Sequence, residues 1–384
     1  MTTMDVLTDL PDTTGFLDVV EIEGDTLRIR GWVAAFDGSA IDGLEVWWRD
    51  GQLPLLELET GMASADVTEV YPKLPHSGAC RFRLVARAPE QHRDILLAVV
   101  PTSASRHGRR LFQLIEPSLP QPPQEHITAI GGSFLNVGLE MLDYFIERGR
   151  LRSDERVLDV GCGVGRIAYT LAYYLSDRGR YDGFDVMSPL VDWATSNITS
   201  RRSNVRFQHV NLHNRMYNPG GDLRADTFRF PYPDASFDFV TLTSVFTHMP
   251  GKEVRHYLDE IVRVLAPGGR VMLTAFVLDD QVRSLIRDGR STQPILHRHG
   301  DGFVADVKVP EAAVGYDELV LKRWIEGSGL RVVSLYPGSW CGRTGGLSYQ
   351  DLLVVEPADE SLSRRGVRGN PLTRWRERFR WGRA

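Results

Sequence analysis

Cysteine is scarce in this chain, and long apolar runs are missing from it. The 384 residues include three cysteines, Cys80, Cys162 and Cys341, which are too far apart for a CxxC zinc site and odd in number for a disulfide framework. No run of about 18 apolar residues occurs that could cross a membrane. The acidic N-terminus lacks the apolar core of a signal peptide. We therefore expect a cytoplasmic protein.

The net charge of −5 is unevenly distributed. Residues 361–384 carry eight arginines and a single acid, so the rest of the chain is acidic. This balance argues against a nucleic-acid partner. Within the basic tail, Leu372, Trp375 and Phe379 have helical spacing. The tail is either an amphipathic helix in peripheral contact with the inner face of the membrane, or a disordered solvated segment.

Two patterns of secondary structure follow one another along the chain. The first part alternates β-branched and aromatic residues between turn signals, which predicts a small all-β sandwich domain. After a proline-rich stretch, strands alternate with helices, which predicts a doubly wound α/β domain with a mostly parallel sheet. Two long insertions at strand ends are expected to be substrate caps rather than disordered. The predicted parts are a flexible N-terminus (1–14), the sandwich (15–114), a stiff linker (115–127), the α/β domain (128–357) with insertions 213–230 and 278–315, and the basic tail (358–384).

A glycine-rich stretch, RVLDVGCGVGR, covers residues 156–166. An apolar strand leads into glycines at positions 161, 163 and 165, and a helical pattern follows, which predicts a ligand-binding loop at the carboxyl end of a strand. The dinucleotide pattern GxGxxG does not fit, because Arg166 occupies the position of its last glycine. No GK[ST] follows, so a phosphate-binding Walker loop is excluded.

Two aspartates indicate which ligand the loop binds. Asp159 precedes the loop, and a carboxylate there suits a cation better than a diphosphate. Asp185 ends the next predicted strand, YDGFDV, where it can accept hydrogen bonds from two ribose hydroxyls. A ligand with a ribose, a positive charge and no phosphate is S-adenosylmethionine.

Four segments now resemble the successive motifs of class I S-adenosylmethionine-dependent methyltransferases over about residues 130–356: RVLDVGCGVGR, YDGFDV, FRFPYPDASFDFVTLTSVFTHMP and EIVRVLAPGGRVMLTAF. The resemblance implies a seven-stranded Rossmann-like sheet with an antiparallel last strand, and methyl transfer from S-adenosylmethionine. Many members of this family have an acidic residue that contacts the adenine amino group at the position of Asn211, whose carbonyl can still accept that bond. The implied cofactor residues are Asp159, Gly161, Gly163 and Gly165 for the methionine part, Asp185 for the ribose, Asn211 for the adenine, and Thr243 and Ser244 near the sulfonium. Cys162, Val186 and Leu212 are also expected to bind the cofactor.

Methyl transfer is an in-line displacement, so the enzyme contributes positioning and, for a hydroxyl acceptor, a base. The leading candidate base is His248 in SVFTHMP, because it follows the fourth strand and imidazole titrates near neutral pH. The alternative is a loop histidine without a catalytic role. His297 and His299 in the second insertion compete for the role of base, and no metal is required.

Several aromatic residues are candidates for acceptor binding. Tyr316, Trp340 and Arg343 are expected to form the acceptor pocket, with both rings stacking on a sugar, unless they are core residues. The N-terminal domain loosely resembles β-sandwich modules appended to enzymes that build bacterial surface polysaccharides. Its residues Trp32, Trp47 and Trp48 are either a glycan platform or core aromatics.

The first expectation is therefore O-methylation of a saccharide or glycolipid in cell-envelope polysaccharide biosynthesis. One alternative is a methyltransferase for small natural products, in which the sandwich supports a homo-oligomer. Another is a catalytically silent protein that binds glycan, which would have no affinity for S-adenosylmethionine.

Overall fold

The computed structural model describes residues 13–103 and 106–358, and the chain divides into two compact units, residues 1–222 and 223–384. The boundary falls inside the α/β region and not at the proline-rich segment. Most of the expected flexible N-terminus and the basic tail after residue 358 lie outside the described residues. Within those residues, no helix is both long and apolar enough to cross a bilayer.

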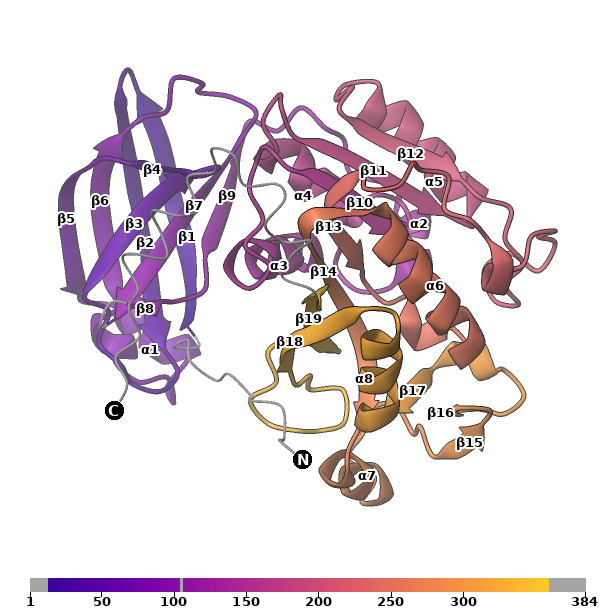
Figure 1. The fold of residues 1–384 in the computed structure, drawn as a ribbon. Helices are drawn as coiled ribbons and strands as arrows, with labels where there is room; N and C mark the ends of the chain where they lie inside the picture. Colours follow the sequence, from indigo (N-terminus) through magenta and orange to yellow (C-terminus); the bar gives the residue numbers. More distant parts are fainter. Residues whose placement is uncertain (1–12, 104–105, 359–384) are drawn as a thin grey trace. The chain divides into compact units, whose positions relative to one another are not determined.

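The first unit begins with an antiparallel all-β domain of two sheets, as the alternation predicts (Figure 1). Apolar residues of both sheets, among them Ile29, Phe82 and Leu97, share one buried core. A short helix, α1 (Ala65–Val70), and a 3-10 turn, η1 (Ser77–Ala79), lie between strands of this domain. One sheet has the order β1 (Thr13–Glu23), β2 (Thr26–Ala35), β6 (Arg81–Arg87), β5 (Leu55–Met62); the other has β4 (Gly51–Leu53), β3 (Gly43–Trp48), β7 (Ile95–Ser103), β8 (Arg106–His107), with β9 (Leu111–Ile115) also on β7.

The three tryptophans of this domain do not form a common platform. Trp32 is buried beside Val67 and Leu74. Trp47 and Trp48 are consecutive in β3, so their side chains point to opposite faces of the sheet. Trp48 packs against the sandwich core. The core interpretation therefore fits Trp32 and Trp48 better than a glycan platform does.

The sandwich is hydrogen-bonded to the helical part of the same unit. Asp50, in the turn after β3, accepts hydrogen bonds from the Tyr174 hydroxyl (2.6 Å) and from the backbone N–H of Ser153 (2.9 Å). In the proline-rich segment, Leu119 is buried; its N–H donates to the Tyr173 hydroxyl (2.9 Å) and its carbonyl accepts from the Tyr169 hydroxyl (3.0 Å). The expected linker is therefore bound along a helix and is not a free spacer.

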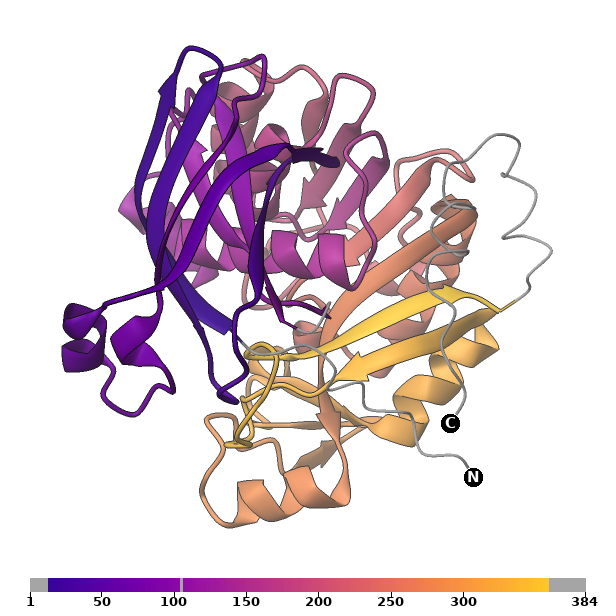
Figure 2. The same cartoon turned by 90° about the vertical axis from the view of Figure 1, so that its left-hand side faces the viewer.

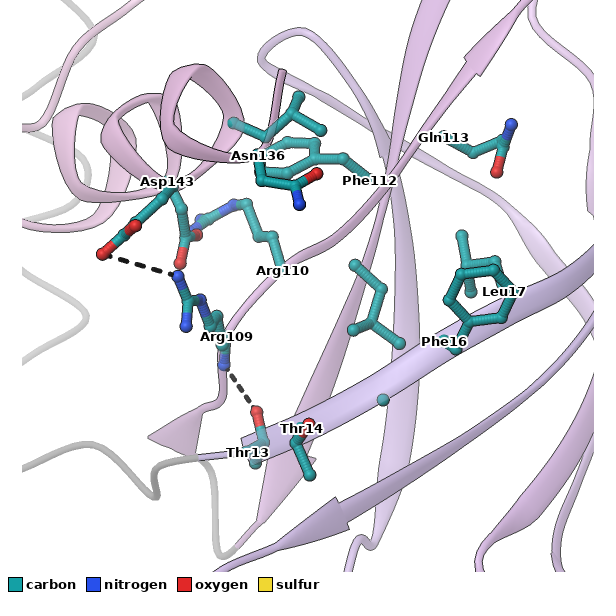
Figure 3. Close-up of a pocket in the computed structure, with 14 residues that line it drawn as sticks. Thr13, Thr14, Phe16, Leu17, Arg109, Arg110, Phe112, Gln113, Asn136 and Asp143 are labelled. Carbon is teal, nitrogen blue, oxygen red and sulfur yellow. Dashed lines mark hydrogen bonds and ion pairs between the residues drawn. The ribbon is translucent and has the colours of Figure 1, made fainter. Parts of the chain in front are cut away.

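A cleft of about 270 Å³ lies between β1, the segment around Arg109 and a helix of the α/β region (Figure 3). On one side, the Arg109 N–H donates to Thr13 Oγ1 (2.8 Å). On the other, the Arg110 guanidinium pairs with Asp143 and with Glu147, both at 2.9 Å. None of the expected cofactor residues lines this cleft.

Replacing Asp50 by alanine tests how firmly the sandwich is attached. The change leaves the backbone N–H of Ser153 without its acceptor, whereas the Tyr174 hydroxyl still has the Leu151 carbonyl at 2.8 Å, so the free energy of unfolding should fall by about 1–3 kcal/mol. Urea denaturation measures this difference, and Glu90→Ala, at an exposed loop residue, is the control that should change nothing. An unaltered midpoint for Asp50→Ala would contradict the inferred contribution of these bonds.

The rest of the first unit alternates strands and helices as predicted. Strands β10, β11 and β12 are parallel, in the order β12-β11-β10. Helix α3 begins at an N-cap, Ser133, whose hydroxyl accepts from the Asn136 N–H. The elements are α2 (Gln124–Ile130), α3 (Phe134–Glu147), β10 (Arg156–Val160), α4 (Arg166–Tyr174), β11 (Arg180–Asp185), α5 (Ser188–Ala194), the π-helical turn η2 (Thr195–Thr199) and β12 (Val205–His209).

The second unit contributes seven more strands within its described residues, 223–358. β13 and β14 are parallel, whereas β19 is antiparallel to both β14 and β18, as expected for the last strand (Figure 2). The elements are η3 (Ala225–Thr227), β13 (Phe237–Leu242), η4 (Phe246–His248), α6 (Gly251–Val264), β14 (Leu265–Leu278), α7 (Asp280–Arg287), β15 (His297–His299), β16 (Gly302–Val304), η5 (Pro310–Ala312), β17 (Val314–Asp317), α8 (Glu318–Gly327), β18 (Leu330–Tyr336) and β19 (Asp351–Pro357).

The strand count of seven is not confirmed, since the α/β part has ten strands. The excess comes from the insertion 278–315 and its continuation, which supply β15, β16 and β17. This insertion is folded: Val282, Leu285 and Ile295 pack with Phe276 and Trp340 in a separate small core. Its apolar residues are too widely spaced in sequence to reveal that core.

Candidate functional site

The glycine loop has the backbone conformation that its sequence predicts. Gly161, Gly163 and Gly165 all have positive φ angles, +79°, +53° and +83°, which residues with a Cβ atom rarely adopt. The N–H groups of Gly161 and Cys162 both donate to the carbonyl of Phe184 (2.9 and 3.1 Å), which fixes the loop against the end of β11. The loop is thus tied to the neighbouring strand before any ligand binds.

Asp159 is buried near the end of β10, and its carboxylate accepts a hydrogen bond from the hydroxyl of Tyr181 (2.7 Å). Gly183 makes this contact possible: it lies beside Asp159 on the adjacent strand, and a Cβ there would be 2.7 Å from the Tyr181 hydroxyl. Burial, opposed by the tyrosine and reinforced by the charge of Asp185, raises the pKa of Asp159 to about 7. Tyr181 and Gly183 were missed in the sequence; their i, i+2 spacing on one strand face is the signal that could have identified them.

Asp185 receives two backbone hydrogen bonds. Its Oδ2 accepts from the Gly163 N–H and its Oδ1 from the Met187 N–H, both at 2.8 Å. Burial nevertheless raises the pKa of this carboxyl above its ordinary value. Each oxygen retains a lone pair for a ribose hydroxyl. Val186, next in sequence, is half-buried.

The charges around the loop suit a zwitterionic cofactor. In the described part of the chain, neither Asp159 nor Asp185 has a lysine or arginine partner, and the basic group that acts on Asp185 is His209. Such an arrangement favours a cationic ligand. Arg166, at the start of α4, donates to the Gly131 carbonyl, but its buried Nε–H has no partner among the described residues, and burial lowers the pKa of the side chain. The residues present therefore fit the sulfonium, ammonium and carboxylate of S-adenosylmethionine.

Three other expected cofactor residues, Cys162, Asn211 and Leu212, lie in the first unit, and their role in cofactor binding stays a prediction. Cys162 is buried, and burial together with the charge of Asp185 raises the pKa of its thiol well above the ordinary value. It is a small unreactive residue of the loop, as its sequence context suggests. Leu212 is buried. Asn211 uses both ends of its amide, accepting from Asn218 Nδ2 and donating to Asp222 Oδ2, each at 3.1 Å.

In the second unit, Thr243 and Ser244 follow β13. Ser244 has a left-handed φ of +61°, which is uncommon for a residue other than glycine. Its N–H donates to Thr274 Oγ1 (2.8 Å), and its hydroxyl donates to Gln350 Oε1 (3.1 Å). Backbone strain held in place by side-chain hydrogen bonds is a frequent property of functional sites.

His248, in the 3-10 turn η4, lies 2.7 Å through its Nδ1 from the backbone carbonyl of Glu311. A carbonyl only accepts, so Nδ1 carries the proton and the lone pair is on Nε2. Burial lowers the pKa of the imidazole below its ordinary value, although the Glu311 bond opposes this. The ring is therefore neutral near pH 7, and its Nε2 has the electronic form of a base.

Two acidic residues near His248 were missed in the sequence. Glu253 lies in the first turn of α6, and burial together with the charge of Glu311 raises its pKa to about 7. Glu311 has a buried Oε2 with no hydrogen-bond partner in the described structure, as does the hydroxyl of Thr247. Partnerless buried polar atoms are rare and mark candidate ligand sites. These acidic residues come close to His248 because the second insertion folds onto η4, and no local sequence pattern predicts that contact.

Tyr316 and Trp340 are buried core residues. Trp340 is 0% exposed, donates through Nε1 to Asp351 Oδ2 (2.8 Å), and packs on Phe276 with ring centroids 4.7 Å apart. The Tyr316 hydroxyl donates to the carbonyl of Met249. The expected stacking on a sugar requires an exposed ring face, which neither residue has, so the structure corrects that interpretation in favour of core packing.

The remaining candidates lie on or beside the second insertion. The Arg343 guanidinium pairs with Asp279, the N-cap of α7, at 3.2 Å. Arg343 is therefore tied by an ion pair to the start of α7, and its expected role in acceptor binding stays a hypothesis. His297 and His299 occupy the exposed strand β15, where solvent surrounds them. Neither has the fixed tautomer that distinguishes His248.

Comparisons with known proteins agree with this geometry. A family model for the methyltransferase domain matches residues 158–273. The 27-O-demethylrifamycin SV methyltransferase of Amycolatopsis mediterranei is 31% identical over 212 residues, which are 54% of this chain and 69% of the relative. Methyltransferase GfsG of Streptomyces halstedii is 33% identical over 153 residues, which are 39% of this chain and 49% of that protein, so about half of the latter is matched.

Among solved structures, a SAM-dependent methyltransferase from Aquifex aeolicus aligns with 61% of this chain and 98% of its own, at 16% identity and a TM-score of 0.38. The sequence relatives and the family model carry the assignment, in agreement with the glycine loop and its two acids. The chain belongs to the class I S-adenosylmethionine-dependent methyltransferases.

Proposed function

We propose that this enzyme methylates a hydroxyl oxygen of a small organic molecule, with His248 as the base. The observation that carries the proposal is the imidazole of His248, which is neutral and has its tautomer set by the Glu311 carbonyl. An alcohol is a weak nucleophile until its proton is removed, so a base of this form suits oxygen methylation.

Different residues of the chain would bind the cofactor and act on the acceptor. Asp159, the glycine loop and Arg166 would hold the methionine part, and Asp185 the ribose. When bound, the cofactor supplies an electrophilic methyl carbon on a sulfonium. We place Thr243 and Ser244 on the cofactor side of the transfer. The bound cofactor would give up its methyl group and leave as a neutral thioether, and His248 Nε2 would take the proton of the acceptor hydroxyl.

A small-molecule acceptor has more support than a saccharide. The relative named 27-O-demethylrifamycin SV methyltransferase acts, by its name, at an oxygen of a small molecule. The two features that favoured a sugar have lost support, since Tyr316 and Trp340 are buried and the tryptophans of the sandwich do not share a face.

The test is methyl transfer from labelled S-adenosylmethionine to extracts separated into low-mass organic, glycolipid and polysaccharide fractions. We expect the label in the low-mass fraction, with mass analysis placing the new methyl group on oxygen. Label in the glycolipid or polysaccharide fraction would contradict the acceptor class, and a new N-methyl group would contradict the role of His248 as an oxygen base.

Cofactor affinity should depend on pH through Asp159. In the ligand-free protein the carboxyl of Asp159 has a pKa of about 7, and a cationic ligand binds best to its ionised form. The Kd of S-adenosylmethionine should therefore be constant above pH 7.5 and rise by up to about tenfold per unit below pH 7. Calorimetry in buffers of different ionisation enthalpy would detect the released proton. The same pH dependence in Asp159→Asn would show that another group causes it.

A further inference from the structure

Three residues from different strands form a closed set of hydrogen bonds in the second unit. The N–H of Ser244, after β13, donates to Thr274 Oγ1 on β14 (2.8 Å). The Thr274 hydroxyl lies 2.5 Å from Gln350 Oε1, and the Ser244 hydroxyl lies 3.1 Å from the same oxygen. Gln350, directly before β19, therefore ties the chain after β13 to β14, and none of the sequence motifs includes it.

These bonds determine which way the amide of Gln350 is turned. The Thr274 hydroxyl already accepts the N–H of Ser244, so its own proton is left to donate to Gln350. The distance of 2.5 Å suits an O–H···O bond and is too short for N–H···O, so the carbonyl end of the amide faces Thr274. The Nε2 group carries two N–H donors and forms no hydrogen bond within residues 13–103 and 106–358. One end of the amide is structural, and the other is available to a ligand.

The backbone that carries Gln350 is fixed on both sides. Before it, the Trp340 N–H donates to the carbonyl of Tyr349 (3.0 Å). After it, the carboxylate of Asp351 accepts from the N–H of Gly338 (2.7 Å). The donors of Gln350 are therefore preorganised, and little conformational freedom is lost when they bind a ligand.

The position of Gln350 in the sheet places it on the ligand side. Strands β13 and β14 run parallel, and ligands of open α/β sheets bind beyond the carboxyl ends of such strands. Because β19 is antiparallel to β14, it begins at that edge, and Gln350 is the residue before it. His248, the proposed base, also follows β13. The edge of the sheet that carries the base thus also carries a pair of N–H donors.

We propose that Gln350 is a specificity-determining residue for the acceptor, with Nε2 donating a hydrogen bond to a second oxygen near the hydroxyl that is methylated. The inference rests on the proposed function, because it takes His248 as the base for that hydroxyl. Two N–H donors bind a carbonyl, ether or hydroxyl oxygen and repel an ammonium group. The acceptors that fit are small molecules with two neighbouring oxygens, and not amines.

The test uses Gln350→Glu, which keeps an oxygen for both hydroxyls but replaces the N–H donors by a carboxylate oxygen. The probe is the low-mass organic extract, supplied in serial dilution with labelled S-adenosylmethionine. The apparent KM for the extract should rise by at least about tenfold, because a carboxylate repels the acceptor oxygen. The maximal rate should change by less than about threefold, as expected for a contact made equally in the bound and transition states. In calorimetry, the Kd of S-adenosylhomocysteine should stay at the wild-type value.

Thr274→Val separates this role from a structural one. It takes the acceptor away from the Ser244 N–H but leaves the amide of Gln350 in place. If the amide served only to hold Ser244, Thr274→Val would raise KM more than Gln350→Glu does, whereas the proposal expects the reverse order. Gln52→Glu, at an exposed position of β4, is the matched control and should change nothing.

Two outcomes distinguish this inference from the proposed function. An unchanged KM in Gln350→Glu, or a fall in the maximal rate alone, would overturn the role of Gln350 and leave the proposed function intact. Label on a nitrogen of the wild-type product would contradict the proposed function, and the KM of Gln350→Glu would still decide whether Gln350 contacts the acceptor.

Discussion

Replacing His248 by alanine is expected to lower kcat by about 10²–10⁴-fold, the usual contribution of a general base. The change removes the nitrogen that accepts the hydroxyl proton but should leave cofactor affinity unaltered, because the methionine and ribose contacts come from other residues. Single-turnover methyl transfer and calorimetry with S-adenosylhomocysteine measure the two quantities separately.

His256 provides a matched control. Its ring also contacts a backbone carbonyl, that of Phe228 at 2.8 Å, so His256→Ala removes a comparable bond at a site without a proposed catalytic role. His256→Ala should retain nearly full turnover.

The rate of the wild type should also depend on pH. Because the pKa of His248 is lowered, the rate should fall only at pH values below the range in which histidine ordinarily titrates. Full activity in His248→Ala would exclude this residue as the base.

Replacing Asp159 by asparagine is expected to raise the Kd of S-adenosylmethionine by about 10–100-fold. The amide can keep the hydrogen bond from Tyr181 but not the negative charge that faces a cationic ligand in a desolvated site. Calorimetry measures the affinity. Asp182→Asn is the control and should leave the affinity unchanged. Asp182, on the neighbouring strand β11, is also a buried aspartate, but its charge is paired with Arg180.

The same substitution should not weaken the ligand-free fold. Because the folded pKa of Asp159 is raised, the carboxyl disfavours the folded state increasingly as pH rises from about 4 to 7. Asparagine removes this penalty, so thermal unfolding of Asp159→Asn at pH 8 should occur at the wild-type temperature or higher. A large loss of stability together with lost binding would instead indicate a structural role for Asp159.

The cofactor half of the site could be predicted from the sequence because its determinants are local. Gly161, Gly163 and Gly165 need a backbone conformation that few other residues adopt, and this need is visible in the spacing alone. Asp159 and Asp185 follow apolar strands, and the ends of adjacent parallel strands necessarily lie together. The antiparallel last strand was implied by family resemblance.

The acceptor half could not be predicted in the same way. The sequence does not distinguish a buried tryptophan from an exposed one. Trp340 is buried because it packs in the small core formed with the second insertion. The bond between His248 and Glu311 joins residues 63 positions apart, which leaves no local signal. On the cofactor side as well, the hydrogen-bond partners of the Asn211 amide are Asn218 and Asp222, which lie seven and eleven residues further along the chain.

Asp50 of the sandwich and Leu119 of the proline-rich segment are hydrogen-bonded to three tyrosines of α4, the helix that starts at the glycine loop. Of these bonds, the one between Asp50 and Tyr174 comes from the sandwich, whereas Tyr169 and Tyr173 contact the segment that follows it. A shortened chain that keeps residues from 116 onward would therefore retain the contacts of two tyrosines, and Tyr174 would still have the Leu151 carbonyl as an acceptor.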